Sequence, residues 1–391
     1  MINNTFYKVA NDLMSRAARG VGLTPITVLD YGTFIEAGRQ LSDNITAAEL
    51  TNTFAQEIAN KVQYTLNVAR AYNADGESLN FGNLPPESVV EIINNAFMDT
   101  RAAEFPTLTD GTSVDMYVIN KAEQIVDYYV KSEAFQIPVT IQTAELRGAF
   151  RSPEAMENFI YGKVMYALNS KNHAIEVARY ALVSYAIIDA TESTSPNVAT
   201  AATNEYSAAR RYNLVSLYNS IHETNLTSDN APYDRDFIAF AVSLIKSVRS
   251  RMAKASESYN AAGLKTFTPE GSSRLKIVAP FRTAIESYLY PNTLHNETNR
   301  LENYETFPYW QNEDKPYEIN YSYGATQDNS KVTPKVLAVL HDEYALMEFT
   351  MIDDVGTTPY NVAGKYTNDW ISCQHSRYLN RNANLVIFTL E

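Results

Sequence analysis

Residues 152–189, SPEAMENFIYGKVMYALNSKNHAIEVARYALVSYAIID, decide the fold that the sequence predicts. Ser152 and Pro153 are typical of a helix start, because serine caps the first turn and proline there loses no backbone hydrogen bond. Apolar side chains then recur near the helical period: Met156, Ile160, Val164, Leu168, Ile175, Ala178, Leu182 and Tyr185. An unbroken helix over this stretch would be about 50–55 Å long, which exceeds what a compact core needs.

The polar residues 169–172 in the middle of this stretch leave two interpretations open. No proline occurs between Pro153 and Pro196, so nothing forces a continuous helix to end. The pattern is equally consistent with two antiparallel helices that turn at residues 169–172. The first interpretation predicts a flat, extended subunit built on one long helix, and the second predicts an ordinary helical hairpin.

The composition is that of a soluble protein that does not bind nucleic-acid phosphates. The chain has 391 residues, 45% of them hydrophobic, and can hold two or three compact units. Its formal net charge of −13 argues against binding to nucleic acid through clustered Lys and Arg. It has 27 tyrosines against two tryptophans, and tyrosine is typical of subunit contacts and of carbohydrate-binding surfaces.

The sequence shows no targeting or membrane segment. Residues 1–8 are not followed by the apolar run that is typical of a signal peptide. The most apolar run, residues 180–188, is too short to span a bilayer. Cys373 is the single cysteine, which excludes an internal disulfide. We therefore expect a cytoplasmic protein with no membrane partner.

Two groups of acidic or metal-type side chains are more typical of turns than of metal or catalytic sites. His341, Asp342 and Glu343 are adjacent, and adjacent residues on a strand point to alternating faces, so they cannot converge on one ion. We predict a turn at the end of a strand there. Asp353 and Asp354 precede a glycine and are typical of an ordinary turn.

The remaining candidate residues do not form a catalytic motif either. Cys373 and His375 are two residues apart and no nearby motif orients a base, so we predict a packed thiol. His173 is predicted to be solvated or capping. Gly20 and Gly22 do not lie between a strand and a lysine-bearing helix, so they are no phosphate-binding loop. The sequence thus predicts no catalytic residue, no cofactor, no metal site and no enzyme.

The coarse pattern of elements is irregular, which favours an α+β fold over a doubly wound sheet. We expect helices over residues 143–150, 205–223, 234–259 and 280–289, and an amphipathic segment over residues 118–130. We expect strands over residues 89–93, 137–141, 274–279, 336–341, 344–350 and 385–390, and a polar, aromatic loop over residues 302–329.

Several short motifs resemble one family when their order and spacing are taken together. They are residues 83–92 (NLPPESVVEI), 136–150, 246–264, 268–271, 279–289, 336–344 (VLAVLHDEY), 368–370 and 378–388 (YLNRNANLVIF). In this order they resemble the major capsid proteins of small, short-tailed bacteriophages of the phi29-like and picovirus type. The resemblance covers most of the chain from about Gln63 onward and leaves residues 302–329 unmatched.

The resemblance implies an HK97-type capsid fold within the α+β class, divided into five regions. Residues 1–62 would be an N-terminal arm region, and residues 63–135 an extended β-hairpin loop with flanking strands. Residues 136–203 would form a peripheral domain with a long spine helix, and residues 204–335 an axial domain. Residues 336–391 would return as strands through the peripheral and axial domains. A spine helix would explain why residues 152–189 exceed the needs of a compact core.

The same resemblance implies a major capsid protein that self-assembles as hexamers and pentamers into an icosahedral or prolate head shell. The shell would enclose double-stranded DNA without sequence-specific binding, and a scaffolding protein and a portal protein would be its partners. Assembly would take place in the host bacterial cytoplasm, and the protein would then reside in the virion.

Residues 84–110 are expected to be the loop that reaches over a neighbouring subunit. Residues 79–105 carry charge and little apolar surface to anchor them to a core of their own. Charged pairs at subunit contacts set register and specificity more than affinity. The candidate contact residues are Glu87, Glu91, Asp99, Arg101 and Glu104.

Two alternatives compete with a phage capsid. An encapsulin-like compartment would have the same fold and enclose cargo, and sequence hardly separates the two. A tyrosine-rich glycan-binding protein belongs to another class, and it would need a secretion or lipoprotein signal, which residues 1–8 lack.

Overall fold

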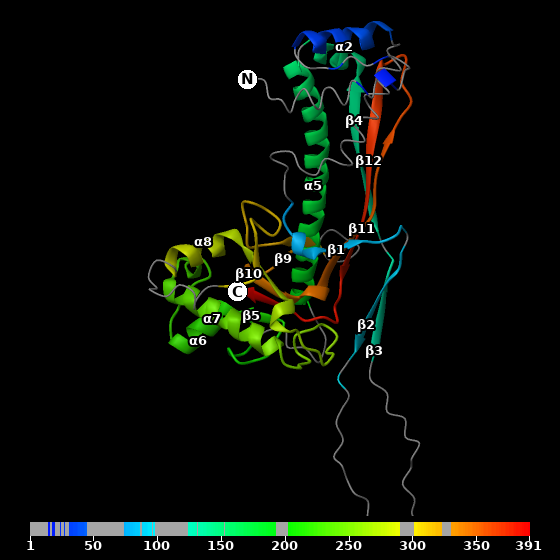
Figure 1. Ribbon diagram of the computed structural model, residues 1–391. Helices are drawn as coiled ribbons and strands as arrows, with labels where there is room; N and C mark the ends of the chain where they lie inside the picture. Colours follow the sequence, from blue (N-terminus) through cyan, green and yellow to red (C-terminus); the bar gives the residue numbers. More distant parts are fainter. Residues whose placement is uncertain are drawn as a thin grey trace, which may run out of the picture.

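One 40-residue helix, α5 (Pro153–Glu192), runs along the subunit and connects its two ends (Figure 1). It is continuous through residues 169–172, so the prediction of one long helix is confirmed and the helical hairpin is wrong. At 1.5 Å per residue it is about 60 Å long. It begins at Pro153, as the sequence predicts.

The computed structural model describes Ser15, Ala18, Arg19, Thr24, Thr27 and residues 31–44, 74–86, 88–95, 97, 124–130, 132–151, 153–192, 202–289, 301–322 and 330–391. A helix, α2 (Tyr31–Asn44), lies at the end of the subunit that is far from the C-terminus (Figure 1). The helix α4 (Thr143–Ala149) lies at the same end and confirms the helix predicted there.

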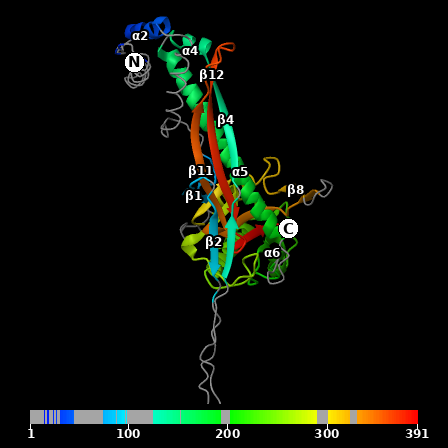
Figure 2. The ribbon, with the colours of Figure 1, turned by 90° about the vertical axis from the view of Figure 1, so that its right-hand side faces the viewer.

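A long four-stranded sheet lies beside the N-terminal part of α5 (Figure 2). Its strands, in spatial order, are β1 (Asn80–Asn83), β11 (Leu346–Thr357), β12 (Tyr366–Leu379) and β4 (Glu133–Gln142). Buried and partly buried residues alternate along β12, as they should in a sheet with one covered face. Ala167 of α5 packs on that face against Val139, Ile371 and Cys373.

Asp353 and Asp354 lie inside this sheet, so the predicted turn at these residues is wrong. They pair with Cys373 and Ser372 of β12, and the chain reverses only after Thr357. The Lys171 ammonium of α5 lies 2.5 Å from the Asp353 carboxylate. The cationic partner of this carboxylate lies on a helix far away in the sequence, so the residues around Asp353 do not reveal it.

The other end of the subunit is a compact body around a five-stranded sheet (Figure 1). The strands, in spatial order, are β5 (Arg211–Asn213), β13 (Leu385–Thr389), β10 (Val336–Asp342), β6 (Ser273–Val278) and β7 (Tyr304–Phe307). Strands β10 and β13 are buried almost throughout, which is typical of strands covered on both faces. The covering helices are α6 (Leu214–His222), α7 (Arg235–Met252), α8 (Ala279–Tyr288) and the C-terminal part of α5.

The predicted strands 274–279, 336–341 and 385–390 and the predicted helix 280–289 are confirmed as β6, β10, β13 and α8. The predicted helix over residues 205–223 is wrong in its first half, where β5 pairs with β13. The predicted helix over residues 234–259 ends already at Met252.

Residues 302–329 are not simply a loop, because β7 pairs in parallel with β6 and β8 (Asn320–Ser322) pairs with β9 (Ser330–Val332). Trp310 anchors the segment between them, since its indole N–H donates to the Val336 carbonyl oxygen at 2.8 Å. The Ser184 hydroxyl of α5 donates to the Trp310 carbonyl oxygen at 3.2 Å. Partners distant in sequence therefore order a stretch whose own pattern is polar.

A buried ion cluster fastens α5 to the long sheet. Glu348 of β11 is 1% exposed and accepts hydrogen bonds from Arg179 of α5 at 2.5 Å and from Arg377 of β12 at 3.0 Å. The His375 ring lies 3.8 Å from the same carboxylate. Burial lowers the pKa of His375 to about 4, so the ring is neutral at physiological pH.

Asp369 of β12 is a buried carboxylate, and no Lys, Arg or His in the described part of the chain forms an ion pair with it. Its Oδ1 accepts from the Thr357 hydroxyl at 2.9 Å, and its Oδ2 is buried with no hydrogen-bond partner among the described residues. Burial raises the pKa of this carboxyl to about 6. The folded state therefore favours the protonated form.

We expect Asp369→Asn to stabilise the subunit near neutral pH and to have a smaller effect near pH 4. A carboxyl with a raised folded-state pKa contributes stability below its unfolded pKa, and this contribution is lost as pH rises through about 6. The stability difference between variant and parent should shift by about 1–3 kcal/mol across this range. Urea denaturation at both pH values measures it, and an equal difference at the two would contradict the prediction.

Candidate intersubunit contact surfaces

Strands β2 (Val90–Asn95) and β3 (Gln124–Tyr129) form a separate antiparallel ribbon beside the compact body (Figures 1 and 2). The predicted strand over residues 89–93 is thereby confirmed, and the described part of the amphipathic segment 118–130 forms β3. Among the described residues, neither strand pairs with any other. A two-stranded ribbon has marginal stability alone, so it depends on packing against its surroundings.

The inner face of the ribbon is fastened to the end of β12. The rings of Tyr129 and Tyr378 lie 4.9 Å apart, and the Tyr129 hydroxyl donates to the Leu379 carbonyl oxygen at 3.2 Å. The Asn380 amide donates to the Asn94 side-chain oxygen at 3.3 Å. The subunit itself therefore holds the ribbon by one face.

The opposite face, which we call the outer ribbon face, is exposed and mostly apolar, with Glu91, Asn95 and Gln124 as its polar members. Side chains of alternating residues share one face of a strand pair. Those on this face include Val89, Ile93, Val126, Tyr128 and Val130, with exposures of 53%, 54%, 38%, 64% and 64%. A contiguous exposed apolar patch marks a site of interaction with another protein.

Of the five charged residues predicted at this contact, the structure describes Glu91 alone. Its carboxylate lies on the outer ribbon face and accepts a hydrogen bond from the Tyr128 hydroxyl at 3.2 Å, which raises the pKa of that phenol. The others, Glu87, Asp99, Arg101 and Glu104, lie outside the described residues. The sequence analysis proposed only charged residues for this contact and did not include the apolar ones. The signal was available, because residues 89–93 place apolar side chains on both faces of the strand.

A second exposed surface follows one stripe of α5. Tyr166, Val177 and Tyr185 are 67%, 54% and 67% exposed, with Gly162 and Ala181 on the same side. Tyr185 continues the helical period in the sequence, but its side chain lies on the exposed side of α5. Leu182, Val183, Ala186 and Ile187 enter the core instead, because this part of α5 meets the compact body. The exposed tyrosines agree with a surface made for contacts.

The cluster His341, Asp342 and Glu343 is the predicted turn at a strand end. It leads from β10 into a short 3-10 helix, η5 (Glu343–Ala345). Glu343 pairs with Arg274 at 3.2 Å, and Asp342 accepts from the Thr268 hydroxyl at 2.7 Å. Burial lowers the pKa of His341 to about 3. In the part of the chain that the structure describes, no three His, Cys, Asp or Glu side chains are placed to hold a metal ion.

Cys373 is a packed thiol, as predicted. It is 1% exposed, its sulfur lies 3.9 Å from an Asp353 oxygen, and burial raises its pKa to about 11. His375 lies near Glu348 and does not act on the thiol. His173 is exposed on α5, with its ring 3.8 Å from Glu176, as expected of a solvated residue. These geometries do not support nucleophilic catalysis.

We expect Cys373→Ser to assemble like the parent and to cost about 1 kcal/mol of subunit stability, the cost of ordinary packing. In the parent, iodoacetamide at about pH 8 should react with Cys373 only after denaturation, because the thiol is protonated and covered. Mass spectrometry of the folded and unfolded chain measures this. Rapid labelling of the folded chain, or an assembly defect that reductant rescues, would contradict the prediction.

Comparison with known proteins identifies the family. A family model described as Phi29-like phage major capsid protein matches residues 34–389. A search of curated proteins found no match. No helix among the described residues is long and apolar enough to cross a bilayer.

Two solved structures share the fold. A capsid structure of Staphylococcus phage Andhra aligns with a TM-score of 0.53 at 11% identity, covering 84% of this chain and 87% of that one. A structure of the head fiber and inner core protein of native bacteriophage P68 aligns with a TM-score of 0.52 at 12% identity, with the same coverage of 84% and 87%.

The mixed fold is thus of the expected HK97 type, and neither the encapsulin nor the glycan-binding alternative is favoured. The chain belongs to the Phi29-like phage major capsid protein family and is a shell-forming protein of the virion.

Proposed function

We propose that this subunit closes the shell as hexamers and pentamers in which the outer ribbon face of each copy lies against a neighbouring copy. The observation that carries the proposal is the exposed apolar patch on a ribbon whose other face is already fastened. Burial of apolar surface stabilises contacts by roughly 25 cal/mol per Å². A neighbouring copy would therefore bury the apolar side chains of the outer ribbon face, which their own subunit leaves exposed.

The five regions expected from the sequence correspond to parts of this assembly. Residues 1–62 form the arm region, residues 63–135 the extended loop with the ribbon, and residues 136–203 the peripheral domain around α5. Residues 204–335 form the axial domain. Residues 336–391 return through both, which is supported by β11 and β12 in the long sheet and β10 and β13 in the compact body.

The charged residues of the loop set the register of this contact. Glu91 lies among the apolar side chains of the outer ribbon face, where a matching cation on the neighbour fixes one alignment. Glu87, Asp99, Arg101 and Glu104 extend the same role along residues 84–110. Affinity comes from the apolar residues, and specificity comes from the charges.

The shell encloses double-stranded DNA without binding its sequence. The net charge of −13 supports this, because a shell lined with basic residues would hold the DNA during packaging. Assembly occurs in the host bacterial cytoplasm, with a scaffolding protein inside and a portal protein at one vertex. The role is structural and not catalytic, since the candidate nucleophile Cys373 is packed and protonated.

Light scattering and negative-stain microscopy of the expressed protein test the proposal, with and without its scaffolding protein. We expect closed particles and, before closure, hexamers or pentamers. A monomer at every concentration under both conditions would overturn self-assembly by this surface.

A further inference from the structure

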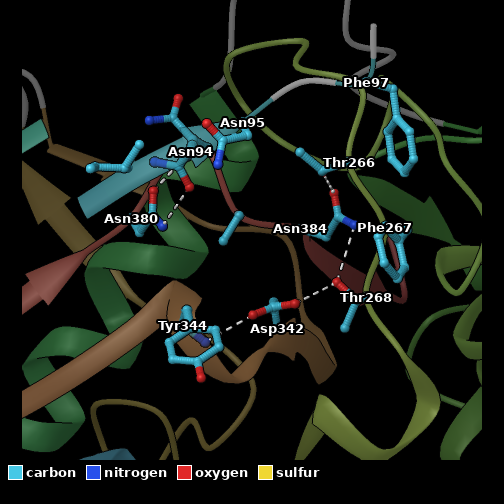
Figure 3. Close-up of a pocket in the computed structure, with 13 residues that line it drawn as sticks. Asn94, Asn95, Phe97, Thr266, Phe267, Thr268, Asp342, Tyr344, Asn380 and Asn384 are labelled. Carbon is cyan, nitrogen blue, oxygen red and sulfur yellow. Dashed lines mark hydrogen bonds between the residues drawn. The ribbon is translucent and has the colours of Figure 1, made fainter. Parts of the chain in front are cut away.

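A cavity of about 430 Å³ opens beside the ribbon, at the connections between the four-stranded and the five-stranded sheet. Figure 3 shows the residues that line it. The ribbon supplies one wall through residues 93–95 and Phe97, and the loop of residues 266–268 supplies another. The floor is made by the two connections between the sheets, residues 342–344 and residues 380–384.

Polar side chains that hydrogen-bond to one another line this cavity (Figure 3). The Asn384 side-chain oxygen accepts from the Thr266 hydroxyl at 3.1 Å, and its amide donates to the Thr268 hydroxyl oxygen at 3.1 Å. Thr268 in turn donates to Asp342 at 2.7 Å. These bonds fix the walls around Thr268 and Asn384, so the cavity is largely preformed.

Asp342 is the one carboxylate among the described lining residues, and none of these is basic. No Lys, Arg or His in the described part of the chain lies within ion-pair distance of it, whereas the adjacent Glu343 has Arg274. Burial, and secondarily the nearby Glu343, raise the pKa of Asp342, which the bonds from Thr268 and the Tyr344 N–H partly offset. A partly buried carboxylate without a cation favours a cationic ligand.

A second polar group of the cavity wall also lacks a partner. The Asn94 side-chain nitrogen is buried and has no hydrogen-bond acceptor among the described residues, while its oxygen accepts from Asn380. A buried donor left unpaired costs free energy. An incoming peptide carbonyl would satisfy it once the Asn94 side chain turns toward the cavity, which a free metal ion would not.

The rim of the cavity is aromatic. The rings of Phe97 and Phe267 lie 5.7 Å apart and both are about half exposed, at 49% and 48%. Such rings suit the aliphatic stem of a lysine or arginine side chain and attract its cation. The aromatic rim, the Asn94 donor and the Asp342 carboxylate therefore all favour the same ligand, a peptide segment that carries a basic side chain.

We infer that the cavity receives a Lys or Arg side chain from an extended segment of a neighbouring copy in the assembled shell. Ile93 belongs to both the cavity wall and the outer ribbon face, so a copy that covers that face reaches the cavity. This step rests on the proposed role of the outer ribbon face. The cation pairs with Asp342, and a backbone carbonyl of the segment accepts from Asn94.

A photo-crosslinking residue, p-benzoylphenylalanine, in place of Phe267 tests this in assembled shells. A mixture of isotopically heavy and light copies separates links between copies from links within one chain. We expect a dimer-sized product in which mass spectrometry places the link on a stretch of a second copy that contains Lys or Arg. The same probe in place of Tyr128 reports contact at the outer ribbon face alone.

The two probes distinguish the possible failures. Links to another copy from position 128 but not from position 267 would overturn the cavity inference and leave the proposed function standing. Links from neither position would overturn both. Links from position 267 only within its own chain, or to a scaffolding protein, would also overturn the inference.

Asp342→Asn gives an independent test, with Glu343→Gln as the matched control. We expect Asp342→Asn to raise the critical concentration for assembly about tenfold, equivalent to about 1.4 kcal/mol per contact. The free subunit should melt at the same or a higher temperature, because an unpaired carboxylate has been removed. Glu343→Gln should assemble like the parent. If Asp342→Asn assembles at the same critical concentration as the parent, the inference is wrong. It is also wrong if added Mg²⁺ or Ca²⁺ raises the critical concentration of the parent to the same extent.

Discussion

Replacing Ile93 and Tyr128 together with aspartate is expected to abolish shells while the subunit stays folded. Both side chains are more than half exposed in the subunit, so folding loses little buried apolar area. In a shell the two carboxylates would be buried in an apolar contact, and each costs several kcal/mol there. Because every copy repeats the contact, assembly should stop. Circular dichroism measures whether the subunit is folded, and negative-stain microscopy measures whether shells form.

Val332→Asp is the matched control, because Val332 is also 54% exposed and lies on another two-stranded sheet, β8–β9. It should assemble. Replacing residues 87–104 with a short Gly/Ser linker should reproduce the double variant, with helical circular dichroism and a cooperative melt but no shells. Normal shells from the double aspartate variant, or an unfolded subunit, would show that the outer ribbon face has another role.

Glu348→Ala is expected to give the largest loss of subunit stability, about 3–5 kcal/mol. The carboxylate is 1% exposed and joins the guanidinium groups of Arg179 and Arg377, so its removal takes the carboxylate partner from the buried Arg179 and leaves Arg377 only with the exposed Glu133. The long helix and the long sheet would then keep the more exposed Lys171–Asp353 ion pair but lose the buried one. The midpoint and slope of urea denaturation measure the effect.

The control for this variant is Glu145→Ala. Its ion pair with Lys163, at 2.9 Å, is partly exposed, and such pairs contribute no more than about 1 kcal/mol. Glu348→Gln keeps the side-chain shape, so its loss of stability should lie between those of Glu348→Ala and Glu145→Ala. A Glu348→Ala subunit as stable as the Glu145→Ala subunit would mean that the ion cluster does not stabilise the fold.

The elements that the sequence predicts well are those whose own pattern is strong. The helical period of α5 and the apolar runs of β10 and β13 are visible without their partners, although the pattern left open whether α5 continues through residues 169–172. The strand β5 and the end of α7 depend on distant contacts, since β5 pairs with β13 and Thr268 N–H donates to the Met252 carbonyl oxygen at the end of α7. Local propensity does not contain those partners.

The candidate contact surfaces show the same division. The charges of residues 84–110 are visible in sequence, and so is the strand at residues 89–93. The cavity was not predicted, because four separate stretches of the chain line it and Asp342 looked like an ordinary turn residue. Asp342 is distinctive because no described Lys, Arg or His forms an ion pair with it. Only the three-dimensional structure shows which side chains surround it.

The position of β13 inside the five-stranded sheet has a consequence for synthesis on the ribosome. The Thr389 hydroxyl donates to the Tyr212 carbonyl oxygen, 177 residues earlier in the chain, so the sheet closes only when residues 385–389 have been made. At about 5–20 residues per second, translation of the chain up to that point takes roughly 20–80 s. Strand β6 ends at Val278, about 110 residues before Thr389, so at the same rate it waits roughly 6–22 s before the sheet can close. We therefore expect a chain that ends before residue 385 to leave β10 without its neighbour β13 and to be unable to join a shell.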